Sequence, residues 1–152
     1  EDSPISRYGG ERGSMAAFVL TTMLEGCPLI YSSQEIGYSR SLSFFSNNVM
    51  KWDSNKAYTD EYIKVMEAFN GTREIRVSDP VFANTGDVLK MTYKNSVGEM
   101  LTVIVNTKNE AATVKVPLDF VGAEVTDLMT GKTVVPTASM DMEPYGYFLF
   151  RK

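Results

Sequence analysis

The sequence predicts an α+β chain in which helices and one buried strand come first and a small antiparallel β-sandwich follows. Hydrophobic residues recur with a helical period in two segments before Gly71. Beyond about Arg76 they alternate or form short runs between turn residues, as strands do. This change of period divides the chain into a first part at residues 1–76 and an all-β part at residues 77–152, with no helix after Gly71.

The first helix is expected at residues 11–25. Four apolar residues spaced i, i+3, i+4 and i+8 form one stripe along it, namely Met15, Phe18, Val19 and Met23. Gly26 then supplies a left-handed stop. Residues 27–31 form an unbroken apolar run that is too short for a helix and is typical of a strand buried on both faces. We therefore expect one α-to-β connection of a parallel sheet, with Cys27 as a buried small hydrophobic residue.

Residues 32–57 are rich in Ser and Asn and show no clean period, which predicts a long ordered loop. Three aromatic residues there either stack on sugar rings or hold the loop in place: Phe44, Phe45 and Trp52. A second helix is expected after Thr59 as its N-cap and should end at Gly71. Its buried stripe is predicted to be Tyr62, Ile63, Met66 and Phe69.

Six short strands are expected in the second part, separated by turn residues such as those at 95–98 and 129–132. They lie near residues 88–93, 100–105, 112–116, 124–128, 133–135 and 146–150. Short strands with regular turns predict a small antiparallel sandwich or barrel.

Composition narrows the chemistry. The net charge is −4 and the lysines and arginines do not cluster, which argues against a nucleic-acid partner. The chain has no histidine, which excludes imidazole bases and Ser-His-Asp triads, and it has no apolar run of the roughly eighteen residues that a membrane span requires. The beginning without Met or a signal-peptide pattern leads us to expect a fragment.

A resemblance covers nearly the whole chain. Residues 26–37, reading GCPLIYSSQEIG, resemble the G-x-P-x-I-Y-x-G-x-E-I-G signature on the eighth barrel strand of the α-amylase family of glycoside hydrolases, family 13. The match departs at Ser33, where the family usually has glycine. Residues 12–24 and 58–76 look like the seventh and eighth barrel helices. Residues 144–150, reading PYGYFLF, look like the last strand of the family's C-terminal β-sandwich domain.

The resemblance implies the last β/α unit of a TIM barrel followed by that domain. It also implies retaining hydrolysis or transfer at α-glucosidic bonds of starch-like glucans, which uses two carboxyl groups about 5–5.5 Å apart. The family carries these on the fourth and fifth barrel strands, which this chain lacks. A third carboxylate, in an N-H-D motif, is expected just upstream of residue 1, with Asp2 as the alternative. We expect the chain alone to be inactive.

Because active sites of such barrels lie at the carboxyl ends of the strands, the candidate substrate-binding residues are those that follow the strand: Gln34, Glu35 and Tyr38. Glu35 alternatively satisfies its own loop or pairs with an arginine, and Gln34 has a similar structural alternative. We expect no metal or cofactor site in this chain, whereas calcium fits the parent protein.

The expected partner of the parent is an α-glucan or oligosaccharide. The barrel remnant should expose an apolar face and self-associate. Two other functions stay open, a carbohydrate-binding module and a structural subunit that completes a barrel supplied by another chain. The family occurs inside and outside cells, so location stays open.

Overall fold

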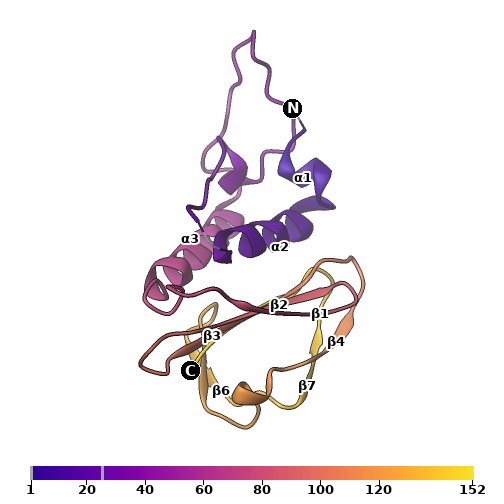
Figure 1. Ribbon diagram of the computed structural model, residues 1–152. Helices are drawn as coiled ribbons and strands as arrows, with labels where there is room; N and C mark the ends of the chain where they lie inside the picture. Colours follow the sequence, from indigo (N-terminus) through magenta and orange to yellow (C-terminus); the bar gives the residue numbers. More distant parts are fainter. Residues whose placement is uncertain (1, 25) are drawn as a thin grey trace.

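The computed structural model describes residues 2–24 and 26–152, and it arranges them in three layers: helices, a six-stranded antiparallel sheet and a two-stranded sheet (Figure 1). The larger sheet has the order β1 (Val81–Thr85), β2 (Val88–Lys94), β3 (Met100–Asn106), β8 (Tyr147–Arg151), β5 (Val125–Asp127) and β6 (Lys132–Val134). The smaller sheet pairs β4 (Ala112–Lys115) with β7 (Ser139–Met142).

The predicted β-sandwich is confirmed, and all six predicted strands are present. Strands β1 and β7 were missed, because β1 is exposed along its whole length and β7 alternates too briefly to stand out. In the described part of the chain, the only helical turn after Gly71 is the short 3₁₀ turn η2 (Leu118–Phe120), which buries Phe120.

The first part contains α1 (Pro4–Arg7), α2 (Gly10–Met23), the 3₁₀ turn η1 (Gln34–Ile36) and α3 (Lys56–Gly71). Helix α2 buries all four residues of its predicted stripe. Among the described residues, no helix has the length and hydropathy of a membrane span.

The start and the buried face of α3 differ from the prediction. Asn55 caps the helix, its side-chain oxygen accepting the Tyr58 amide at 3.4 Å, whereas the Thr59 hydroxyl donates to the carbonyl oxygens of Asn55 and Glu35. The buried residues are Tyr58, Tyr62, Val65 and Ala68, and Ile63 is 49% exposed. Tyr62 of the predicted stripe is therefore confirmed, and Met66 and Phe69 pack partly buried against the core, whereas the prediction for Ile63 was wrong.

The strand predicted at residues 27–31 is absent. These residues have no regular structure, Leu29 is 79% exposed, and Cys27 is exposed instead of buried. A parallel strand acquires its hydrogen bonds and its burial from neighbouring strands, and the described residues provide no neighbour for this one. The apolar run therefore lies open, with its local pattern unmatched by partners.

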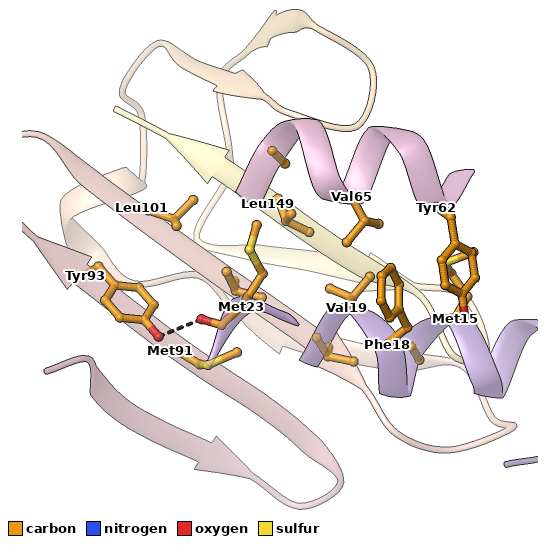
Figure 2. Close-up of a cluster of buried hydrophobic side chains, with 14 of the residues drawn as sticks. Met15, Phe18, Val19, Met23, Tyr62, Val65, Met91, Tyr93, Leu101 and Leu149 are labelled. Atoms are coloured by element: carbon orange, nitrogen blue, oxygen red, sulfur yellow. Dashed lines mark hydrogen bonds between the residues drawn. The ribbon is translucent and has the colours of Figure 1, made fainter. Parts of the chain in front are cut away.

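One hydrophobic core joins the helices to the larger sheet (Figure 2). Met15, Phe18, Val19 and Met23 of α2 pack with α3 and with the sheet face that carries Met91, Tyr93, Leu101, Val103 and Leu149. The buried Tyr93 hydroxyl donates to the Met23 carbonyl oxygen at 2.7 Å. The opposite face of the sheet packs on β4 and β7, so β3 is buried along its whole length. The two parts of the chain thus share one core.

Three tyrosines at the junction of α2, α3 and β8 should make the folded chain less stable at alkaline pH. Burial raises the pKa of Tyr58, Tyr62 and Tyr147 above the ordinary value, and neighbouring Glu61 raises that of Tyr147 further. The unfolded chain loses these protons near pH 10, where the folded chain still holds them. The stabilisation is therefore complete below pH 10 and is lost as pH rises above it.

We expect the free energy of unfolding in urea to fall above about pH 10 by up to about 1.4 kcal/mol per pH unit for each such group. Tyr147→Phe removes one titrating group and should make this slope shallower. Between pH 7 and 8 the free energies of unfolding of the variant and the parent chain should change with pH in the same way. Equal slopes in the variant and the parent chain would contradict the prediction.

Candidate functional site

The loop between the open segment 27–31 and α3 is shaped by two left-handed residues on either side of η1. Ser33 has φ +65° and is buried, and Gly37 has φ +68°. Position 33 is the one at which the sequence departs from the α-amylase signature, and its φ lies where glycine is favoured. The turn is closed by the Gln34 amide, which donates to the Tyr31 carbonyl at 2.9 Å, and by the Tyr38 amide, which donates to the Ser33 carbonyl.

The Gln34 side chain is used inside the protein. Its amide nitrogen donates to the Tyr62 hydroxyl of α3 at 2.9 Å, and its oxygen accepts the Tyr31 amide at 3.3 Å. Both ends of the amide group therefore fix the loop to itself and to α3. This geometry matches the structural alternative for Gln34 and leaves one lone pair and one N–H for a ligand.

Glu35 lies on the side of η1 that faces α3. Its backbone carbonyl accepts the Thr59 hydroxyl at 3.0 Å. Its carboxylate oxygen Oε2 is buried and has no hydrogen-bond partner among the described residues. Neither the loop nor an arginine of this chain pairs with it there, and Glu35 does not line the pocket described next.

A small pocket of about 120 Å³ lies between the start of the chain and this loop. It brings Asp2 together with Gln34 and Tyr38, which lie more than thirty positions further along the sequence, and Tyr31 and Arg40 also line it. Ligand pockets usually measure about 300–1,000 Å³, so this one is large enough for part of a sugar unit only.

The aromatic residues of the long loop do not hold it in place. Phe44, Phe45 and Trp52 are exposed, Phe45 completely, and the segment between η1 and α3 projects away from the helices (Figure 1). Phe44 alone of the three lines the small pocket. The exposed rings are available to a sugar or to another protein surface.

The lining of the small pocket has one carboxylate, Asp2, and one guanidinium, Arg40. Retaining glycoside hydrolysis needs two carboxyl groups about 5–5.5 Å apart, and the described lining offers no second one. Its hydroxyl, amide and guanidinium groups can form hydrogen bonds to a hydroxylated ligand. In the described part of the chain, no three Asp, Glu or Cys side chains come together as a metal-binding group.

Sequence reasoning missed Arg40, Leu42 and the residues Ser3 and Pro4 as parts of this lining. Ser3 is placed there because it caps α1, its hydroxyl accepting the Ser6 amide at 3.3 Å. A four-residue helix has no periodicity that a sequence pattern reveals. Arg40 is the only basic residue between Gly13 and Met50, which was the one available signal.

Comparison with known proteins finds similarity to a cyclomaltodextrinase and to solved structures that include an α-amylase. No family model matches it. It is 29% identical over 150 residues to a cyclomaltodextrinase of Geobacillus thermopakistaniensis strain MAS1, a match covering 93% of this chain and 26% of that protein. The chain therefore spans about a quarter of the length of this curated relative.

Solved structures share the fold at lower identity. An Anoxybacillus α-amylase superposes with a TM-score of 0.74 at 14% identity, over 90% of this chain and 31% of that one. AmyP, solved in complex with maltose, gives a TM-score of 0.73 at 13% identity, over 93% of this chain and 34% of that one. In each case the fold of this chain corresponds to a minor part of the longer protein.

Proposed function

We propose that this chain, which has the fold of part of the α-amylase-family glycoside hydrolases, is the C-terminal piece of such an enzyme. In this proposal residues 1–76 complete a (β/α)8 catalytic barrel and residues 77–152 form the β-sandwich domain that follows it. The parent hydrolyses α-glucosidic bonds of starch-like glucans by a retaining mechanism, with its carboxylate pair upstream of this piece. The piece alone is inactive.

The observation that carries the proposal is the match to the cyclomaltodextrinase, which covers 93% of this chain but 26% of that protein. The open segment 27–31 supports it, because an apolar run with strand-like character and no partner fits an interior barrel strand whose neighbours come from elsewhere. The pocket wall with a single carboxylate supports an incomplete site.

The test is release of reducing sugar from soluble starch by this chain and by the full-length protein, at equal molar concentration. We expect activity from the full-length protein alone. Activity of the chain by itself at a comparable rate would overturn the assignment of the catalytic carboxylates to upstream strands. An inactive full-length protein that still binds glycan would instead favour a carbohydrate-binding module, and activity restored by a co-purifying chain would favour a structural subunit.

Within this proposal Gln34 and Tyr38 lie along the substrate cleft, and Asp2 is the alternative third carboxylate. Tyr38→Phe in the full-length protein should raise KM for malto-oligosaccharides roughly fivefold, since a neutral hydrogen bond contributes about 1 kcal/mol. The stability of the variant should be unchanged. Tyr8→Phe, at an exposed position outside this pocket, is the matched control. An unchanged KM for Tyr38→Phe would remove Tyr38 from the cleft.

The exposed apolar residues of the first part should make the isolated chain self-associate. They lie close together in sequence: Leu29, Ile30, Tyr31, Phe44, Phe45, Val49 and Trp52. Sedimentation velocity should show the mean mass rising with concentration, and replacing Leu29 and Phe45 by serine should weaken this rise. Val97→Ser, at an exposed hairpin turn of the β part, should leave it unchanged. A monodisperse monomer at high concentration would contradict the prediction.

A further inference from the structure

A second and larger hollow lies in the β part, on the face of the six-stranded sheet opposite the helices. It is an open groove of about 770 Å³ between the edge strand β1 with its neighbour β2 and the end of β4 with the residues after it, 115–121. This volume falls within the range of about 300–1,000 Å³ that small-molecule sites occupy. We refer to it as the β1 groove.

The wall of the β1 groove carries a lysine where a sandwich interior usually carries an apolar residue. Lys90 of β2 is 8% exposed, and it follows the buried Val88 on the same face of the strand. Its ammonium group donates to the Thr85 hydroxyl and to the Lys115 carbonyl, both at 3.3 Å. Both acceptors are neutral, and among the described residues no carboxylate forms an ion pair with Lys90.

A buried charge without a counter-ion is costly, because neutral acceptors replace only part of its hydration. Two long hydrogen bonds also leave the third ammonium N–H unassigned. Lys90 lines the groove, so an anion entering from solvent can reach that donor. The partner that would best stabilise this ammonium group is therefore a negatively charged oxygen.

The rest of the groove wall suits a ligand that carries hydroxyl groups. Thr92 lies next along the same face of β2 and shares a 3.1 Å hydrogen bond with Thr102 of β3, its cross-strand partner. Ser78 and Ser139 add two more hydroxyl groups to the rim. Apolar side chains such as Val81 and Leu118 cover the remaining wall and are exposed in this chain.

The charges around the groove favour a single anionic group. Three lysines, Lys90, Lys94 and Lys115, and two aspartates, Asp79 and Asp119, line it, which is a surplus of one positive charge. The two aspartates disfavour a ligand with several negative charges along its length. We propose that the β1 groove binds a small polyhydroxylated organic anion, whose phosphate or carboxylate group faces the Lys90 ammonium.

The competing explanation is purely structural. The bond from Lys90 to the Lys115 carbonyl ties β2 to the end of β4, and so connects the two sheets of the sandwich. That role predicts that replacing Lys90 changes stability but that no anion binds. The two explanations therefore differ in a direct binding measurement and do not depend on the catalytic proposal.

The test is an NMR titration of the isotope-labelled chain with glucose 1-phosphate, gluconate and glucose, each to about 10 mM, well above a millimolar Kd. We expect at least one of the two anions to shift the backbone amides of residues 81–92 and 115–121, with glucose causing no comparable shift. The phosphate and carboxylate arms identify which head group the site prefers. Added salt should weaken the binding.

Lys90→Met should lower the affinity about tenfold or more, because it removes a charge-assisted hydrogen bond. Lys90→Arg should retain much of it, and Lys64→Met, on the exposed surface of α3, is the control. The proposal would be overturned if neither anion caused shifts, if glucose bound equally well, or if the shifts mapped outside the groove. Unchanged affinity in a folded Lys90→Met variant would also overturn it. The ligand titration of the unaltered chain decides the matter even if Lys90→Met does not fold.

Discussion

Replacing Phe18 by alanine should lower the free energy of unfolding by about 3–5 kcal/mol, the cost of emptying a large aromatic site in a packed core. Phe18 is 3% exposed and stacks on Tyr62 of α3, with ring centroids 4.0 Å apart and planes at 20°. The ring thus links α2 to α3, inside the cluster that continues into the sheet (Figure 2).

The measurement is urea unfolding of the chain and of Phe18→Ala, followed both by helical circular dichroism and by amide exchange of β2 and β3. Because the helices and the sheet share one core, both probes should report the same decrease in the free energy of unfolding. Phe45→Ala is the matched control, and since Phe45 is completely exposed, stability should change by no more than about 0.5 kcal/mol. A loss below about 1 kcal/mol for Phe18→Ala would show that the helices do not depend on this contact.

Gly13→Ala should destabilise the chain by about 3 kcal/mol, at the upper end of the usual cost of overpacking. A Cβ atom built at Gly13 would lie 1.6 Å from the Tyr8 carbonyl oxygen and 3.2 Å from the Tyr145 ring. The backbone at Tyr8 has little room to yield, since its amide donates to the Pro4 carbonyl of α1. Helix propensity alone predicts the opposite, because alanine is favoured over glycine by about 1 kcal/mol inside a helix.

Gly71→Ala separates the two effects. Gly71 also lies in a helix, at the end of α3, but a Cβ atom there meets nothing within 4 Å. We expect Gly71→Ala to be neutral or stabilising by up to about 1 kcal/mol. The thermal midpoint of Gly13→Ala should fall by roughly 10 °C, given about 2–4 °C per kcal/mol for a chain of this size. A Gly13→Ala protein as stable as Gly71→Ala would show that the close approach to Tyr8 is not rigid.

Tyr145, two residues before β8, packs against the start of α2. It holds φ +55°, a left-handed conformation that is costly for a bulky residue, and its amide donates to the Lys108 carbonyl at 2.9 Å. Its hydroxyl would meet a Cβ at Gly9 at 2.4 Å. Gly9, just before α2, and Gly13, inside it, therefore leave the space that this ring occupies. The sequence analysis noted residues 144–150 as a motif but did not connect them to these glycines.

Patterns with a local cause were readable from the sequence alone. The stripe of α2, the end of α3 at Gly71 and the six predicted strands follow from side-chain period and from turn residues, which act over a few neighbouring positions. The motif at residues 26–37 resembles the α-amylase signature, and the comparisons found similarity to a cyclomaltodextrinase and to the fold of an α-amylase. The motif placed Gln34 and Tyr38 in one loop, and the structure brings both to one pocket.

Features that depend on a distant partner were decided only by the tertiary structure. The run at residues 27–31 has the composition of a buried strand, but burial needs neighbouring strands, and without them Leu29 and Cys27 lie exposed. Asp2 reaches the small pocket from just before α1, which packs on α2, and Lys90 is buried where β2 meets the end of β4. Sequence period records which face of an element is apolar, whereas the packing of the whole chain decides what that face meets, and with it the chemistry of each site.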